Sequence, residues 1–524
     1  MLYSVVTNLL PPADSLSSPG VSRLLPASFS ETTVTFAFLT YVHQLSFVES
    51  DCCKKGKNGR ISPIPAEPRD CKGLLPLFQQ LVKISALDGK NLLARFPILA
   101  MALLSLWALP VSADIGFIVR SHKSLRALAE LCLHHGCTVV RNLDAPSNEL
   151  FLITAPDTTD PNALLATLSH ASEVVEVEPD QSVGLIGSQN NVTTMPVGLS
   201  DTVPVNYFGA SVWDGYVSQR AGQIVRSSEA HTTFQLAGSG IVADIDTGVD
   251  PAHPALQTVL LPGYDFTRNQ PNGSEMTDFT EPPSSDPSSM PAQVNFWTVA
   301  VLHQSTAAVL DGDPKYAAFG HGTMVMGVIH LVAPQALLMP LKAFGSNGSA
   351  KLSDIVRAIH YAVQNNAKVI NMSFDLTTES SQLRAALDFA ARHDVICVAS
   401  VGNDSMKEIT YPAAYTASVM GVASTSDFDA RSTFSNFGDS TVWVDAPGEA
   451  IITTYPFGTY AAGWGTSFSA PFVSGAASLL VNQQGTINQS QAAAALAHAQ
   501  FIGPDLGNGR LDIVQALQSV VAVK

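Results

Sequence analysis

From residue 238 onward, continuous apolar runs alternate with segments that repeat apolar residues every three or four positions. The first pattern predicts strands and the second predicts amphipathic helices. A strand that is apolar along its whole length is buried on both faces, as in a parallel sheet that helices cover on both sides. We therefore predict an α/β domain with a mostly parallel central sheet and helices on both faces. The expected strands are 240–246, 336–343, 368–373 and 395–400, and the expected helices are 321–332, 353–366 and 381–393.

Three polar residues lie where such a sheet carries its chemistry, beyond the carboxyl ends of the strands. Asp246 closes a buried strand, His321 opens a helix, and Ser467 stands at the start of a helix of small residues. A serine hydroxyl becomes a good nucleophile when a base takes its proton, and an imidazole base needs a carboxylate to fix its tautomer. The N-terminus of a helix also favours developing negative charge. The three residues together predict acyl transfer.

A fourth residue, Asn403, follows the expected strand at 395–400 and carries an amide that can donate to an oxyanion. One such donor contributes roughly 3–4 kcal/mol to transition-state stabilisation. Asp244 stands two residues before Asp246, so its side chain points to the same side of the strand. Asp244 is either a second acid or a solvated or backbone-bonded carboxylate, and the sequence leaves both open.

In their order, spacing and flanking residues, these segments resemble the subtilisin-like serine proteases, the subtilases of peptidase family S8. The resemblance covers about 225–520 and implies a subtilisin-like fold. It implies Ser467 as the nucleophile, His321 as general base and acid, and Asp246 as the partner that orients His321. It also implies Asn403 as the oxyanion donor, together with the backbone N–H of Ser467.

The resemblance further implies a substrate site. The segment Val369-Ile-Asn-Met-Ser-Phe374 is similar to the edge segment with which the family pairs an extended peptide. Asp375 follows it where the family often has glycine, and it would crowd or charge the mouth of the first specificity pocket. Met324 replaces a second histidine at a position that is not catalytic, and Phe468 replaces the usual methionine after the nucleophile, a change that the side-chain volume tolerates. The implied substrate-binding residues are Ser373, Phe374, Asp375, Ser400 and Gly402.

A smaller domain and a linker are expected ahead of the catalytic domain. Residues 114–183 show the order strand, helix, strand, strand, helix, strand, which is the ferredoxin-like split motif. The resemblance implies that this small α+β domain is an inhibitory propeptide of the inhibitor-I9 type, which occupies the cleft with its C-terminal end and is removed by the enzyme itself. Residues 184–225 show no clear period and are expected to be a linker and an N-terminal arm. The catalytic domain then spans 226–524.

An uncharged apolar stretch at 96–113 ends in Val111-Ser-Ala113, a pattern typical of signal-peptide cleavage. Pro97 and Pro110 leave too short an uninterrupted apolar run for a membrane span, which needs roughly 20 residues. We therefore expect a signal peptide rather than a span. Residues 1–95 are then an N-terminal extension, either a mis-assigned translation start or a cytoplasmic segment ahead of a membrane anchor.

Composition and motif order exclude other classes of protein. With 28 Lys and Arg against 44 Asp and Glu, the net charge is −16, so nucleic-acid binding is not expected. An α/β-hydrolase needs Gly-x-Ser-x-Gly and the chain order Ser, acid, His, and neither is present. Catalysis needs no cofactor. The acidic loops at 262–290 and 311–313 carry oxygen donors of the kind that Ca²⁺ prefers, but solvated loops look the same, so a structural calcium ion stays open.

We therefore expect a secreted serine endopeptidase that is made as a self-processing zymogen. It would hydrolyse protein or peptide substrates through an acyl-enzyme, with its own propeptide as intramolecular inhibitor. The expected location is extracellular, with the periplasm or the cell surface as variants, and no stable membrane span is expected after signal cleavage. The alternative is a catalytically blocked binding protein with the subtilase fold, in which Asp375 or the insertion at 280–291 closes the cleft.

Overall fold

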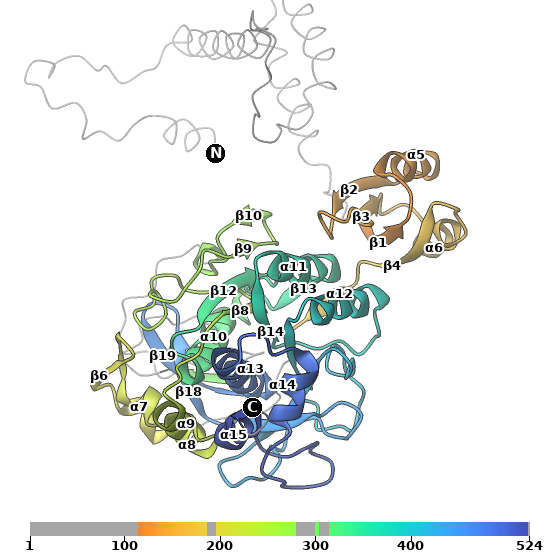
Figure 1. The fold of residues 1–524 in the computed structure, drawn as a ribbon. Coiled ribbons are helices and arrows are strands. Elements are labelled where there is room, and N and C mark those ends of the chain that lie inside the picture. The colour runs from red at the N-terminus through yellow and green to blue at the C-terminus, as the bar shows by residue number, and fades with distance from the viewer. Residues whose placement is uncertain (1–113, 186–194, 279–298, 303–313, 522–524) are drawn as a thin grey trace, which may run out of the picture. The chain divides into compact units, whose positions relative to one another are not determined.

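The computed structural model describes residues 114–185, 195–278, 299–302 and 314–521. The N-terminal extension at 1–95, the signal-like segment at 96–113 and the insertion at 280–291 lie outside these residues. The rest of the chain is drawn in Figure 1.

Residues 114–183 form a four-stranded antiparallel sheet with two helices, and the strands lie in the order β2-β3-β1-β4. Each helix begins at a side chain that accepts hydrogen bonds from free backbone N–H groups. Ser124 does so ahead of the first helix and Asp160 ahead of the second. The elements are β1 (Ile115–Ser121), α5 (Leu125–His135), β2 (Thr138–Asn142), β3 (Leu150–Ala155), α6 (Pro161–Ser169) and β4 (Val174–Pro179).

The larger part of the chain is built on an eight-stranded sheet in the order β10-β9-β12-β8-β14-β15-β16-β17. Every neighbouring pair is parallel except the outermost pair, β10 and β9. The expected mostly parallel sheet is therefore confirmed. The strands are β8 (Ile241–Asp246), β9 (Tyr264–Asp265), β10 (Gln270–Pro271), β12 (Leu337–Lys342), β14 (Ala367–Met372), β15 (Ile396–Ser400), β16 (Met420–Thr425) and β17 (Val444–Pro447).

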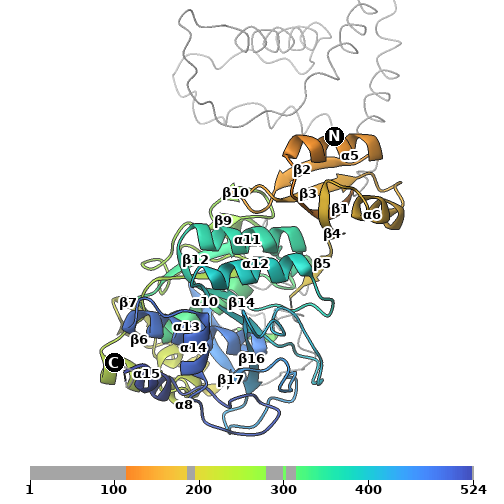
Figure 2. The ribbon, with the colours of Figure 1, turned by 45° about the vertical axis from the view of Figure 1, so that its right-hand side comes forward.

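Helices cover both faces of this sheet (Figures 1 and 2). On one face, Val242 of β8 shares an apolar core with α10 (His321–Val332) and α13 (Thr466–Gln483). On the other face, the alternate residues Ala243 and Ile245 share a second core with α11 (Leu352–Gln364) and α12 (Ser381–Arg392). Because successive side chains of a strand point to opposite faces, one apolar strand serves both cores.

The remaining elements are short. Residues 195–225 show no period in the sequence, yet they form a hairpin and short helices whose buried residues, such as Leu199 and Tyr216, join the main core. Elements of four or five residues are too short for a period to be detected. The remaining described elements are β6 (Pro204–Tyr207), β7 (Ala210–Trp213), α7 (Asp214–Val217), α8 (Arg220–Ile224), α9 (Ser227–Phe234), β5 (Ser182–Gly184), β13 (Ser349–Lys351), β11 (Val299–Leu302), β18 (Ile451–Tyr455), β19 (Thr459–Trp464), α14 (Gln489–Leu496), α15 (Ile513–Val521) and the 3₁₀ turns η2 (Val197–Ser200), η3 (Met276–Asp278) and η4 (Pro314–Tyr316).

Candidate active site

Asp246 and His321 meet because the end of β8 lies against the start of α10. Asp246 is the last residue of the strand and His321 is the first residue of the helix. The two backbones approach so closely that a Cβ atom on Gly322 would lie 2.1 Å from the carbonyl oxygen of Gly248. Glycine at 322 is thus what lets the histidine helix dock on the loop that follows the aspartate.

The carboxylate of Asp246 holds the imidazole of His321. Nδ1 of His321 lies 2.8 Å from each of the two carboxylate oxygens, and both side chains are 1% exposed. The backbone N–H of Thr247 donates to the same carboxylate at 2.6 Å. With Nδ1 bound in this way, the other ring nitrogen, Nε2, is the one left to exchange a proton.

Ser467 is the second residue of α13 and is almost fully buried. Its hydroxyl donates to the backbone carbonyl of Ser373 at 3.2 Å. Among the described residues, therefore, the Asp246–His321 pair is hydrogen-bonded, whereas the serine hydroxyl points to Ser373 rather than to the imidazole. Phe468, the next residue, lies beside His321 with the ring centres 5.9 Å apart.

Asn403 faces the start of α13 and has a fixed amide orientation. Its Oδ1 accepts from the backbone N–H of Thr466 at 2.9 Å and from the Thr466 hydroxyl at 3.0 Å. Since the oxygen is held by two donors, the Nδ2 group is the end of the amide that remains able to donate elsewhere. The side chain is 5% exposed, so a group that it contacts is largely shielded from water.

The five expected substrate-binding residues lie on two adjacent segments after β14 and β15. Phe374 forms an antiparallel bridge with Leu185, and its carbonyl accepts from the Ser400 hydroxyl at 3.5 Å. Gly402 has φ of +106°, a conformation that suits glycine, and a Cβ atom there would lie 2.6 Å from Oδ2 of Asp375. The Ser373 hydroxyl donates to the Ser467 carbonyl, and the Ser373 carbonyl accepts from the Ser467 hydroxyl.

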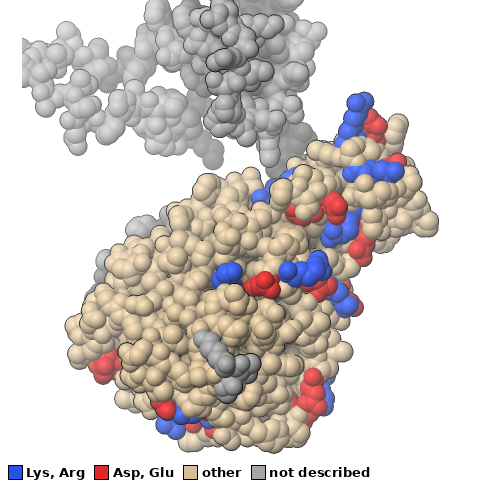
Figure 3. All heavy atoms as spheres, in the orientation of Figure 1, with Lys and Arg blue, Asp and Glu red and all other residues tan. Residues whose placement is uncertain are grey.

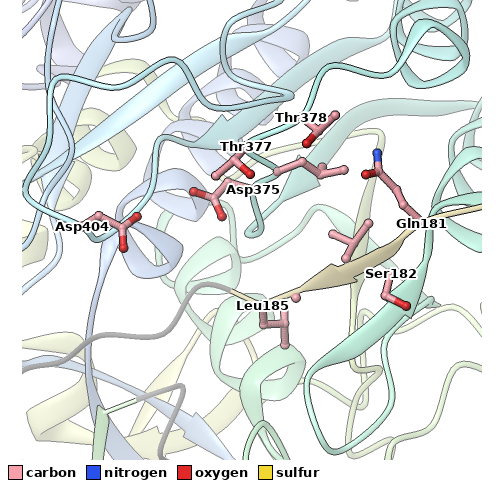
Figure 4. A pocket seen from close by; sticks show the side chains of 10 residues that line it. Gln181, Ser182, Leu185, Asp375, Thr377, Thr378 and Asp404 are labelled. Atoms are coloured by element: carbon pink, nitrogen blue, oxygen red, sulfur yellow. The ribbon is translucent and has the colours of Figure 1, made fainter.

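Asp375 lines a pocket together with Asp404 and the strand at 182–185, and Figure 4 shows these side chains around the opening. Burial and the nearby charges of Asp404 and Glu408 raise the pKa of Asp375 to about 7. The sequence indicated that this residue charges or crowds the pocket. The carboxyl group changes its charge near neutral pH, so the pocket has a pH-dependent polarity.

A buried hydrogen-bond network next to Ser467 was not expected from the sequence. Nδ2 of Asn371 donates to Asp244 at 2.9 Å and to the Ser373 hydroxyl at 3.0 Å, and that hydroxyl donates to the Ser467 carbonyl at 3.0 Å. Asp244 is thus a carboxyl group held by an amide, in the middle of the sheet. Burial and the charge of Asp246 raise its pKa well above the ordinary value.

A second group that the sequence did not reveal is Glu275, which contacts both catalytic elements. It is fully buried and accepts from Gly320, Thr247 and Thr323. It stands in the turn-rich run Asn272-Gly-Ser-Glu, and an isolated acid in such a run has no pattern that sets it apart from a solvated one.

Two carboxylates of the acidic loop at 262–278 form ion pairs. Asp265 and Asp278 both bind Arg268, and Asp278 also binds Lys342 at 2.8 Å. Within the described ranges, no group of three His, Cys, Asp or Glu side chains is arranged to hold a metal ion. The rest of the expected calcium-binding region, 279–290 and 311–313, lies outside them.

Comparisons with known proteins identify the family. Residues 238–515 match the family model described as the subtilase family, Peptidase_S8. The chain is 30% identical to thermitase from Thermoactinomyces vulgaris over 58% of this chain and 98% of that protein. It is 32% identical to subtilisin NAT from Bacillus subtilis subsp. natto over 56% of this chain and 70% of that protein. A solved structure, a lanthipeptide protease, aligns with a TM-score of 0.46 at 22% identity over 58% of this chain and 95% of that one. The chain belongs to the subtilase family and is a serine-type endopeptidase.

Proposed function

We propose that the chain is a secreted endopeptidase, made as a self-processing zymogen, whose acyl-enzyme forms on Ser467. The observation that carries this proposal is the buried Asp246–His321 pair, with Nδ1 held at 2.8 Å by both carboxylate oxygens. A base oriented in this way next to the N-terminal serine of a buried helix is the arrangement that acyl transfer requires.

In the proposed reaction, Nε2 of His321 takes the proton of Ser467 as Oγ attacks the peptide carbonyl. The same proton then goes to the amine that leaves, and a water molecule attacks the acyl-enzyme with His321 as base again. The Ser467 hydroxyl must first exchange its hydrogen bond with Ser373 for one with His321. Catalytic contacts of this kind are often completed only with substrate bound.

The proposed oxyanion site uses two donors that converge at the start of α13. One is Nδ2 of Asn403, whose orientation follows from the two bonds that hold its oxygen. The other is the backbone N–H of Ser467, one of the free N–H groups of the first helical turn. Both would stabilise the negative charge that develops on the substrate oxygen.

The contacts of residues 182–185 support the proposal that the domain at 114–183 is a ferredoxin-like inhibitory propeptide. β5 pairs antiparallel with β13, and Leu185 donates to the Gly348 carbonyl at 2.8 Å while it bridges to Phe374. This stretch therefore lies in extended form beside Ser373, and a peptide substrate would bind there by the same backbone pairing.

Two carboxylates of the small domain also bind the catalytic part of the chain. Glu178 accepts from Ser380 and Ser381 at the start of α12, and Asp180 accepts from the N–H and the hydroxyl of Ser353 at the start of α11. Negative charge at a helix N-terminus is favourable. These contacts support a domain that folds onto the enzyme and holds its own C-terminal end in the cleft.

The proposed export signal at 96–113 lies outside the described residues. Among the helices that are described, none is both long and apolar enough to cross a membrane. Secretion is tested with the Ser467→Ala protein, which keeps the small domain, by its distribution between cells and growth medium and by its N-terminal sequence: a protein that stays in the cells and retains 1–113 contradicts it.

The function is tested by the intact mass of the purified protein before and after a phosphonylating reagent specific for active-site serines. We expect a wild-type chain that begins downstream of Leu185 and gains one adduct, and a Ser467→Ala variant that keeps residues 114–185 and gains none. A wild-type chain that keeps residues 114–185 and takes no adduct would refute the proposal and favour the blocked, binding-only alternative. A Ser467→Ala chain that has lost residues 114–185 would refute self-processing alone.

A further inference from the structure

Glu275 follows the short strand β10, and its side chain is fully buried. Its carboxylate accepts four hydrogen bonds, all from the two segments that carry Asp246 and His321. The donors are the Gly320 N–H at 2.7 Å, the Thr247 hydroxyl at 3.0 Å, the Thr323 N–H at 3.3 Å and the Thr323 hydroxyl. A third segment of the chain thus joins the aspartate loop to the histidine helix.

On the aspartate side, the contact goes through Thr247. Its N–H donates to Asp246 at 2.6 Å, and its hydroxyl accepts from the N–H of Gly322 at 2.9 Å. A hydroxyl has one proton to donate, and here that proton goes to Glu275. The position of Thr247, and with it the Asp246 carboxylate, therefore depends on an acceptor at 275.

On the histidine side, Glu275 takes the free N–H groups of the first turn of α10. Gly320 precedes the helix and carries no capping side chain, and Thr323 is the third helical residue. The Thr323 hydroxyl accepts from the N–H of Asp250 at 2.8 Å, so its single proton also goes to Glu275. A carboxylate from elsewhere in the chain thus does what a capping side chain does in most helices.

A buried cation lies near the Glu275 carboxylate. Lys342 at the end of β12 is buried and donates to the Thr247 carbonyl at 2.8 Å, and its charge acts on Glu275. Asp244 of β8 and Tyr455 of β18 also face it. Burial raises the pKa of Glu275 to about 7 despite the four donors and Lys342, which lower it.

We propose that Glu275 is a positioning residue, which ties the Asp246 loop to the first turn of the His321 helix and so fixes the carboxylate against the imidazole. This inference rests on the proposed roles of Asp246 and His321. All four hydrogen bonds of the side chain are ones that it accepts, so an amide cannot replace it. In Glu275→Gln, the NH₂ group faces a backbone N–H, and the aspartate loop and the helix separate.

The test compares Glu275→Gln with Asp512→Asn in the complete chain, each counted by active-site titration. Asp512 is a matched control, because it is also buried and also accepts four hydrogen bonds, from Arg226 and Gln515 near α15. For Glu275→Gln we expect kcat to fall roughly tenfold or more with KM within about twofold, as for an interaction needed in the transition state. The acid side of the pH profile of kcat should move to lower pH, because a loosened Asp246 stabilises protonated His321 less.

A purely structural role would lower the titrated fraction and leave the pH profile of the remaining molecules unchanged. A titrated Glu275→Gln enzyme with wild-type kcat and pH profile overturns the proposal. If that variant does not fold, Thr323→Val removes only one of the four donors, and wild-type kcat with an unchanged pH profile there overturns it equally. A wild-type chain that takes no titrant refutes the proposed function itself, before any variant is compared.

Discussion

At the scale of single residues, a substitution of Asn403 tests the proposed oxyanion site directly. The side chain is oriented by Thr466 and carries one free NH₂ group. We expect Asn403→Ala to lower kcat about 10²- to 10³-fold with little change in KM, a range that comes from the equivalent measurement on a subtilisin. Steady-state kinetics on a short peptide checks this.

The companion variant for this measurement is Thr466→Val. It keeps the Asn403 amide but removes one of the two donors that orient it, so its kcat should fall much less than that of Asn403→Ala. If Asn403→Ala keeps kcat within about twofold of the wild type, Asn403 is not the oxyanion donor.

Asp375 gives the pocket a charge that depends on pH. Its pKa is raised to about 7 with residues 182–185 lining the pocket, and a bound peptide in the same place would keep it buried, so in the complex the carboxyl group is neutral at pH 6 and ionised at pH 8. We expect the ratio of kcat/KM for a lysine peptide over a leucine peptide to rise between these values by up to about fivefold, which corresponds to about 1 kcal/mol for a partly exposed ion pair. In Asp375→Asn the ratio should stay constant, and an equal rise in that variant would assign the effect to another group.

At the scale of elements, the sequence predicts long periodic segments well and short ones poorly. α10 was expected at 321–332 and α12 at 381–393, and both occur within one residue of these bounds, because each is about three turns long and is followed by an apolar strand. β5 and β13 are three residues each and exist through their pairing with one another, which no local pattern records. The site residues show the same difference. Asp246 lies in a sequence motif and could be predicted, whereas the contacts of Glu275 depend on how three segments of the chain pack and could not.

The helix starts of α11 and α12 yield a prediction for the small domain. Burial raises the pKa of Glu178 and of Asp180, so docking takes up protons and should become tighter as pH falls toward about 4, the ordinary value of a carboxyl group. In the Ser467→Ala background, we expect Glu178→Gln with Asp180→Asn to remove the pH dependence of the protection against hydrogen exchange at the Ser353 and Ser381 amides, since neither side chain can then take up a proton.

The control for that exchange measurement is Glu149→Gln in the same domain. Glu149 is exposed and reaches only Arg120, at 4.0 Å, through an ion pair. Its removal should leave exchange at both serine amides unchanged. An equal pH dependence of the protection in the double variant and in the control would show that the two carboxylates do not take up protons when the domain docks.

At the scale of the whole molecule, the charge is negative, sparse and mixed. Only 14% of residues are charged, and on the described part of the face in Figure 3 Lys and Arg lie among Asp and Glu rather than in a patch of one sign. The charges that make the protein respond to pH lie in its interior instead. Four acids, two of them buried and two partly buried, have their pKa raised to between about 6 and about 8: Glu275 and Asp445 are buried, and Asp354 and Asp375 are partly buried.

These raised values make stability depend on pH with a definite sign. A carboxyl group whose pKa is higher in the folded state binds a proton on folding, so its contribution is complete below the unfolded pKa near 4 and is lost as pH rises through the folded value. Asp445 in β17 is the clearest case, because both its oxygens are buried and have no hydrogen-bond partner in the described part of the chain, and its pKa is about 8.

We therefore expect the free energy of unfolding to fall by about 1.4 kcal/mol per pH unit between pH 5 and pH 7 from Asp445 alone. Asp445→Asn cannot titrate, so its slope should be smaller than that of the parent by this amount, while the other three acids keep a residual slope of the same sign. Urea unfolding of Ser467→Ala protein, which cannot digest itself, measures both slopes. Asp439→Asn, which removes an exposed carboxylate nearby, should match the parent. If the Asp445→Asn slope equals that of the parent, Asp445 is already ionised in the fold, and its partner must come from outside the described residues.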